Sequence, residues 1–192
     1  MIESALQRKN ICVAKKITIK SLVSLGIIAA AILLPQLFHT LLGSKAGITW
    51  LPMYLPILLG GCILGWAWGL GLGVVSPIIS FALTSIWGSP MPALTRLPFM
   101  IVELSVFATV TGLFSKLIAK KSWMSFIAVL TAELCGRSIF LLLAVIFHSV
   151  SPLTPSVVWQ QIVNGFVGLG TQAIIVPLLV IGLNAIINRE HE

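Results

Sequence analysis

Long apolar runs separated by short polar or proline-rich breaks make up most of the sequence. A helix needs about 20 mostly apolar residues to cross the roughly 30 Å hydrocarbon core of a membrane. A chain of 192 residues therefore has room for about six crossings and little else. We predict an all-α integral membrane bundle of six transmembrane helices, over residues 17–38, 50–64, 69–86, 98–118, 123–147 and 158–187.

The basic residues divide this predicted bundle into two ends. One group falls on the same side of a six-span layout: Arg8, Lys9, Lys15, Lys16, Lys20, Lys116, Lys120, Lys121 and Arg189. On the other side the layout places Lys45 and Arg96. Because cytoplasmic flanks carry the excess of Lys and Arg, we predict a cytoplasmic lead-in at 1–16, a transmembrane domain at 17–187 and a cytoplasmic tail at 188–192.

Composition agrees with a lipid-embedded chain, since 58% of the residues are apolar and 9% are charged, against roughly a quarter charged in soluble domains. The net charge of +7 would suit a nucleic acid, but the basic residues do not form one interleaved face. We therefore expect the lipid bilayer, and no nucleic acid, as a partner. Cys12, Cys62 and Cys135 are too far apart in the sequence to indicate a disulfide framework or a metal site.

The sequence contains none of the common catalytic motifs. It has no HExxH, GxSxG or Walker A pattern and no pair of carboxylates spaced for a metal. We therefore predict that the chain is not an enzyme, uses no cofactor or metal, and does not itself hydrolyse ATP.

Glycines recur at every fourth position across the second and third predicted spans, at Gly61, Gly65, Gly69 and Gly73. Small residues at this spacing let helix backbones approach closely within a membrane. We expect the row to pack inside the bundle and to be divided into two helices by a tight turn at 65–68. Gly26 and Ala30 form a similar step in the first span, and we predict that it docks another membrane subunit, with internal packing as the alternative.

Three charged residues lie inside the predicted spans, where a charge is costly and usually faces a cavity or a partner. Glu133 and Arg137 are four residues apart with the acid first, which favours an ion pair along one helix. The sequence leaves open whether this pair is structural or binds a ligand. Arg137 is nearer the predicted outer side and Glu103 lies in the outer half of the fourth span, so both are candidates for a binding site.

Polar and aromatic residues at this outer level are predicted to line one pocket. The candidate substrate-binding residues are His39, Trp50, Met53, Tyr54, Arg96, Glu103, Arg137, Gln160 and Asn164. Gln161 and His148 lie at the same predicted level. Aromatic walls with a few polar groups suit a small water-soluble organic ligand.

Several segments resemble the S components, the substrate-binding membrane subunits, of energy-coupling factor (ECF) transporters. They are Leu51-Pro-Met-Tyr-Leu-Pro-Ile-Leu-Leu-Gly-Gly61, Ser76-Pro-Ile-Ile-Ser-Phe-Ala-Leu-Thr84, Met91-Pro92 and Glu103-Leu104. The resemblance extends over most of residues 17–187 and includes chain size, six spans and cytoplasmic termini. The first span departs from the family in its alanine-rich motif, which is reduced to Gly26-Ile-Ile-Ala-Ala-Ala31.

The resemblance implies a bacterial, multi-pass plasma-membrane protein that binds a vitamin or vitamin precursor from outside. It also implies partners, namely a membrane T component and two cytoplasmic ATPase subunits that drive import. Cobalamin or a corrinoid precursor is the first expectation for the ligand, with hydroxymethylpyrimidine, pantothenate and queuosine-type compounds as alternatives. The rival function is a stand-alone transporter in which Glu103 or Glu133 changes protonation, and it predicts uptake driven by a proton gradient without any partner.

Overall fold

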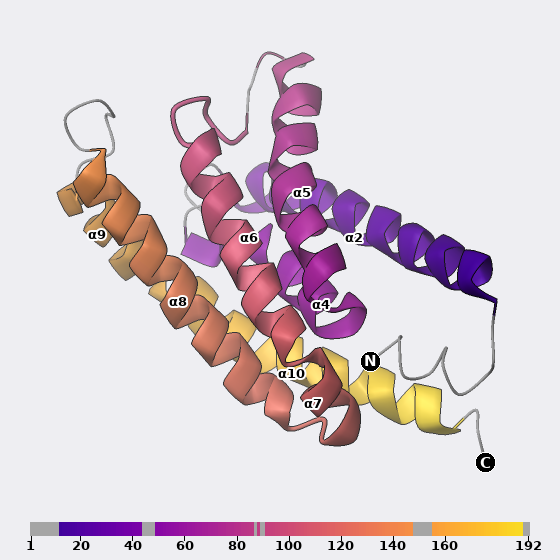
Figure 1. Cartoon of the computed structure of the whole chain (residues 1–192). Helices are drawn as coiled ribbons and strands as arrows, with labels where there is room; N and C mark the ends of the chain where they lie inside the picture. The colour runs from indigo at the N-terminus through magenta and orange to yellow at the C-terminus, as the bar shows by residue number, and fades with distance from the viewer. Residues whose placement is uncertain (1–11, 44–48, 87, 89–90, 148–154, 190–192) are drawn as a thin grey trace.

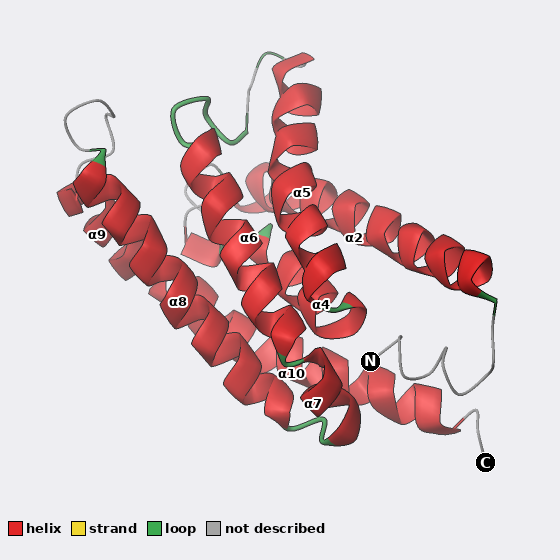
Figure 2. Cartoon of the chain, viewed as in Figure 1, coloured by secondary structure: helices red, strands yellow, loops and turns green. Residues whose placement is uncertain are grey.

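The structure, a computed structural model, describes most of the chain: residues 12–43, 49–86, 88, 91–147 and 155–189. Every regular element in these ranges is a helix (Figure 2), which confirms the predicted all-α class. The helices are α2 (Val13–Leu42), α4 (Tyr54–Leu64), α5 (Trp66–Ile86), α6 (Leu97–Leu113), α7 (Ser115–Lys120), α8 (Met124–Ile146), α9 (Pro155–Asn164) and α10 (Phe166–Arg189).

Four helical segments are long and apolar enough to cross a membrane: Val13–Leu41, Trp66–Ile86, Met124–Ile146 and Phe166–Ile186. Two further apolar helices, α4 and α6, are shorter. The outer surface of the bundle suits hydrocarbon, because Leu22, Leu134 and Phe166, on three different helices, are each 71% exposed. The chain is thus a multi-pass membrane protein by helix length and surface, while the count of six crossings stays a prediction.

The helix boundaries differ from the predicted spans in three ways. The turn between the second and third spans is shorter than expected, because Gly65 alone leaves the helix, with φ +92°, and Trp66 already begins α5. The first helix continues through Pro35 instead of ending near it, although proline removes one backbone donor. The fourth and sixth spans are each divided into two helices, at Phe114 and at Gly165.

Helix α4 occupies the centre of the bundle and contacts α2, α5, α6, α8 and α10. The predicted glycine row brings α4 and α5 against α6. A Cβ added to Gly69 would lie 2.6 Å from the backbone oxygen of Ala108, and one added to Gly73 would lie 2.5 Å from Cα of Ser105. Gly61 meets the same turn of α6. The prediction that these glycines pack inside the bundle is confirmed, because a larger residue would require backbone atoms to move.

The segment that leads into α4 is held against α10. Gln172 Nε2 donates hydrogen bonds to the backbone oxygens of Trp50 (3.1 Å) and Leu51 (2.9 Å). Gly168, one turn earlier, lets this backbone approach α10, since an added Cβ would lie 2.5 Å from the oxygen of Thr49. Leu51 has φ +48°, which is uncommon for a residue other than glycine. These contacts fix the direction in which the chain enters α4.

The bundle has two distinct ends (Figure 1). The start of α2 lies at the right of the view, α7 at the bottom and the end of α10 at the lower right. The segment 91–96 and the start of α9 lie toward the upper left. The lysines of α2 and α7 are therefore separated from the 91–96 segment by the length of the bundle.

Candidate ligand-binding site

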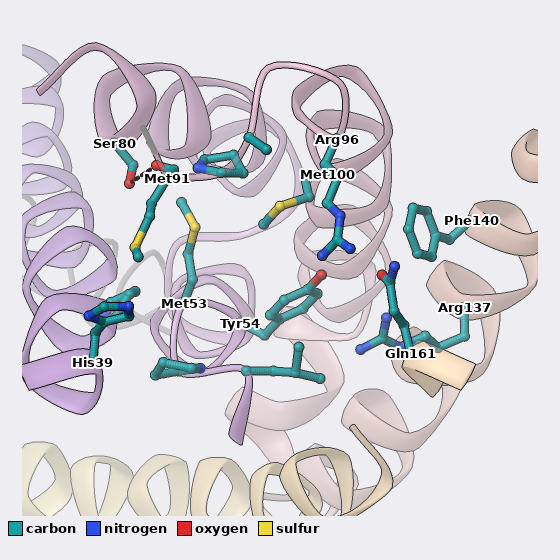
Figure 3. Close-up of a pocket in the computed structure, with 15 residues that line it drawn as sticks. His39, Met53, Tyr54, Ser80, Met91, Arg96, Met100, Arg137, Phe140 and Gln161 are labelled. Carbon is teal, nitrogen blue, oxygen red and sulfur yellow. Dashed lines mark hydrogen bonds between the residues drawn. The ribbon is translucent and has the colours of Figure 1, made fainter. Parts of the chain in front are cut away.

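A cavity of about 330 Å³ opens between the end of α2, the entry to α4, the 91–96 segment, α8 and α9 (Figure 3). It lies toward the end of the bundle that is remote from α7. Five of the predicted binding residues lie on its wall: His39, Met53, Tyr54, Arg96 and Arg137. The structure thus brings together side chains from four separate parts of the chain.

Helix ends position most of these side chains. His39 lies in the last turn of α2, which ends where the Gly43 N–H donates to the His39 oxygen at 3.1 Å and φ of Gly43 is +81°. Tyr54 is the first residue of α4, directly after the segment held by α10. Arg96 immediately precedes α6, where Pro98 favours the start of a helix.

Tyr54, Glu103 and Arg137 form a buried polar cluster that joins α4, α6 and α8. The Tyr54 hydroxyl donates to Glu103 Oε2 at 2.7 Å, and Arg137 Nη1 lies 2.8 Å from Glu103 Oε1. The guanidinium carbon of Arg137 lies 5.2 Å from the centroid of the Tyr54 ring, a cation–π distance. Glu103 itself is fully buried behind the cavity wall. It compensates the charge of Arg137 and orients the two side chains that do reach the cavity.

The predicted ion pair along α8 is replaced by this pair between helices. Glu133, one turn before Arg137, is 7% exposed, and its Oε1 has no hydrogen-bond partner among the described residues. Ion pairs four residues apart on a helix contribute only about 0.2–0.5 kcal/mol. A buried carboxylate that Tyr54 already orients is a stronger partner for Arg137, so the contact to α6 prevails.

Three other predicted residues lie outside the cavity wall. Gln160 and Asn164 are exposed on α9, whereas Gln161 between them lies on the wall. A helix turns by about 100° per residue, so neighbouring side chains point in different directions. Trp50 is 38% exposed and does not reach the wall. His148 lies outside the described residues.

Much of the cavity wall is apolar, and most of its apolar residues were not among the predicted binding residues. Met91, Met100 and Phe140 lie there beside Met53. Thioether side chains are flexible and polarizable, so they adapt to irregular ligand shapes. An apolar residue carries little signal in a sequence that is 58% apolar, and this is why these positions could not be singled out.

The segment that follows α5 is tied back onto that helix. Ser80 Oγ donates to the backbone oxygen of Met91 at 2.9 Å, and the Met91 N–H donates to Thr84 Oγ1 at 2.7 Å. Both hydroxyls belong to the 76–84 motif on which the family resemblance partly rests. The structure gives this motif a physical role, because it holds Met91 at the cavity wall.

The described residues contain no group of three or more His, Cys, Asp or Glu side chains placed to hold a metal ion. In the same part of the chain the three cysteines are free, with Cys12 exposed, Cys62 buried and Cys135 half-buried.

The predicted docking step on α2 is accessible. Gly26 is exposed, and a Cβ added there would have no heavy atom within 4 Å. Ala30, one turn further along, is half-buried. A groove of about 370 Å³ between α2 and α5, bordered by Ser24, Ile28 and Gly71, lies on the other side of α2, because two residues turn a helix by about 200°. The open space beside Gly26 is therefore on the outer face of α2.

Comparisons with known proteins place the chain in a family. The family model described as "ECF transporter, substrate-specific component" matches residues 20–180, a range that includes every residue on the cavity wall. No curated protein and no solved structure matches the sequence. Since the family match covers well over half of the chain, and since the helical bundle holds a cavity of the size that small ligands occupy, the chain belongs to the substrate-specific components of ECF transporters.

Proposed function

We propose that the chain captures a small water-soluble vitamin or vitamin precursor in the cavity and delivers it for ATP-driven import. Family membership implies association with the T component and the ATPase components of an ECF transporter. We take the complete assembly to be this chain, one membrane T component and two cytoplasmic ATPase subunits in a bacterial plasma membrane.

The cavity is the observation that carries this proposal. Small-molecule sites are mostly apolar with a few well-placed polar groups, and here the thioether and aromatic wall carries Tyr54, Arg96 and Arg137. The 91–96 segment, which lines the cavity, lies away from the lysine-bearing helix α7 (Figure 1). Because Lys and Arg favour the cytoplasmic side, we propose that the cavity faces outward and that both termini are cytoplasmic.

The cavity volume favours a small ligand. Small-molecule sites usually measure about 300–1,000 Å³, and the value of about 330 Å³ lies near the lower limit. Cobalamin and its corrinoid precursors carry a large macrocycle with many side chains, and they need a much larger space. We therefore propose a ligand of the size of hydroxymethylpyrimidine, pantothenate or a queuosine-type base in place of the corrinoid that the sequence suggested.

Uptake by proteoliposomes tests the proposed function. The small molecule released when the purified chain is denatured is identified by mass spectrometry and then supplied as a labelled probe. We expect uptake only when the chain is reconstituted with the T component, both ATPase subunits and ATP. Uptake by the chain alone, driven by a proton gradient, would contradict the proposal and favour a stand-alone transporter that uses Glu103 or Glu133.

We also propose that the T component docks at Gly26 and Ala30, because small residues allow a partner helix to approach closely. Gly26→Leu should reduce co-purification with the T component by at least roughly tenfold. Ligand binding should be unchanged, since Gly26 is not on the cavity wall. Gly182→Leu is the matched control, at another exposed helical glycine with no heavy atom within 4 Å of an added Cβ. Equal co-purification of the two variants would assign docking to another surface.

A further inference from the structure

We infer that the cavity is built to hold an organic anion, a small molecule with an ionised carboxylate or phosphate at one end and an apolar body at the other. This inference rests on the proposed binding function and narrows it to one chemical class. Three features of the wall carry it: unpartnered buried donors, a surplus of positive charge, and an aromatic face that is already occupied.

Buried donors on the cavity wall lack partners. Arg137 is 8% exposed, and its Nε and Nη2 are buried without a hydrogen-bond partner among the described residues. Gln161 Nε2 is also buried and unpartnered. These nitrogens donate and do not accept, so the group that satisfies them must be an acceptor. A carboxylate or phosphate presents several acceptor oxygens, which a guanidinium can bind through two parallel hydrogen bonds.

The charged side chains on the described cavity wall are positive. Glu103 compensates Arg137, and its two oxygens are engaged by Tyr54 and Arg137. Arg96 lies on the wall as a second guanidinium and has no ion-pair partner among the described residues. In Figure 3 the Arg96 guanidinium and the Gln161 amide point toward the same region, near the Tyr54 hydroxyl. Arg96 and Arg137 lie on the wall, whereas the carboxylates of Glu103 and Glu133 do not, so the wall favours an anion over a cation.

A cationic ligand would find no carboxylate on the described cavity wall. Proteins usually hold organic cations on the face of an aromatic ring or beside a free carboxylate. The Tyr54 ring already has the Arg137 guanidinium 5.2 Å from its centroid, and it packs edge-on with Phe107 at 5.3 Å. Glu103 is buried behind the wall with both oxygens engaged. Both modes are therefore used within this cluster, and Glu133, whose Oε1 has no partner among the described residues, does not lie on the cavity wall.

The cavity also has an apolar side. The thioethers of Met53, Met91 and Met100 lie on the side away from Arg137 (Figure 3). A ligand with its acid group at the guanidinium side and its carbon body on the thioethers would satisfy both sides at once. The wall therefore gives an amphipathic anion one preferred orientation.

Matched acid and neutral probes test the inferred ligand class. The pairs are pantothenate with pantothenol, nicotinate with nicotinamide, and hydroxymethylpyrimidine phosphate with hydroxymethylpyrimidine, each measured by isothermal titration with the purified full chain. We expect at least one anion to bind at least roughly tenfold more tightly than its neutral partner. The first two pairs report on a carboxylate and the third on a phosphate. Tighter binding of the neutral members, or no binding of any anion, would overturn the inference.

A charge reversal of nearly the same shape tests the site. Gln161→Glu replaces an unpartnered donor by a carboxylate on a half-buried side chain, so the fold should survive. It should weaken the best anion at least roughly tenfold and affect its neutral partner less. Gln160→Glu adds the same charge one residue away on the exposed face of α9 and should change neither affinity. Unchanged anion affinity in Gln161→Glu would refute the assigned site.

The two proposals can fail separately. If anions bind as expected but the chain assembles with no T component, the transporter role is wrong and the ligand class stands. If ATP-driven uptake works and the transported compound is neutral or cationic, the transporter role stands and the ligand class is wrong.

Discussion

Two opposite charges, Glu103 and Arg137, meet at the back of the cavity, where Glu103 is fully buried and Arg137 is 8% exposed. Removing charges from water is costly, and only close, directed contacts offset that cost. Charges inside apolar spans stand out in a sequence, so both residues could be predicted as candidates. Their pairing could not, because sequence spacing favours Glu133 as the partner of Arg137. The close approach of α6 to α8 decides the matter, and it depends on Gly136, where the ring of Phe107 fills the space of a side chain.

Loss of one charge from this pair should be more damaging than loss of both. Arg137→Met is expected to lower the free energy of unfolding by about 3–5 kcal/mol, because Glu103 stays buried without its counter-charge. The double variant Glu103→Gln, Arg137→Met should recover part of that loss. Thermal and denaturant unfolding in detergent, followed by tryptophan fluorescence, measures both variants.

Arg96→Met is the control for this experiment, since it makes the same substitution on the cavity wall at a half-buried residue. We expect it to change the free energy of unfolding by less than about 1 kcal/mol. Equal melting temperatures of Arg96→Met and Arg137→Met would show that loss of the buried ion pair costs no more stability than loss of a half-buried arginine.

Helices α5 and α6 pack along a seam to which α5 contributes the glycines Gly69 and Gly73. The four-residue spacing that includes Gly69 and Gly73 predicted this seam, because close approach in a membrane requires small residues at a helical period. The rotation of α9 could not be predicted in the same way. Gln160 and Gln161 are chemically identical neighbours, and the choice between them is made by Val158, which packs into a buried cluster with residues of α6 and α8. Such long-range contacts are not visible in local sequence.

Two glycines on α5 should respond differently to the same substitution. Gly73→Ala should lower the free energy of unfolding by roughly 1–3 kcal/mol, because the new methyl group meets the backbone of Ser105. Gly71→Ala, two residues earlier, has open space around it, and it should be neutral or stabilising by up to about 1 kcal/mol through better helix propensity. Unfolding in detergent compares the two, and similar melting temperatures would argue against close packing at the seam.

The described part of the molecule has two different ends, with the lysines of α2 and α7 toward one and the cavity toward the other. The distribution of Lys and Arg between the flanks of the apolar runs was enough to predict this arrangement. The number of crossings is harder to predict. Helix α4 has 11 residues and, at 1.5 Å per residue, spans only about half of the hydrocarbon core. Six crossings require that residues 49–53 extend α4 and that α7 extends α6 across the membrane.

Cysteine accessibility in cells tests this orientation. The test uses two single-cysteine variants, Thr95→Cys and Lys120→Cys, in a chain from which Cys12, Cys62 and Cys135 have been removed. Thr95 is an exposed residue near the cavity, and Lys120 is an exposed residue of α7. A membrane-impermeant maleimide should label Thr95→Cys in intact cells and Lys120→Cys only after permeabilisation. The reverse pattern would invert the proposed orientation, and labelling of both from one side would remove the fourth crossing.

The two hydrogen bonds from Gln172 also bear on how tightly so small a cavity can bind. They hold Trp50 and Leu51 through contacts within the protein itself, and Met53 and Tyr54 follow directly on the cavity wall. This wall is therefore preorganised, and a ligand need not freeze it at a cost of about 1–2 kcal/mol per residue. A compound with few atoms has little binding free energy to lose, so a wall held in place by α10 preserves the affinity of the cavity for a ligand of that size.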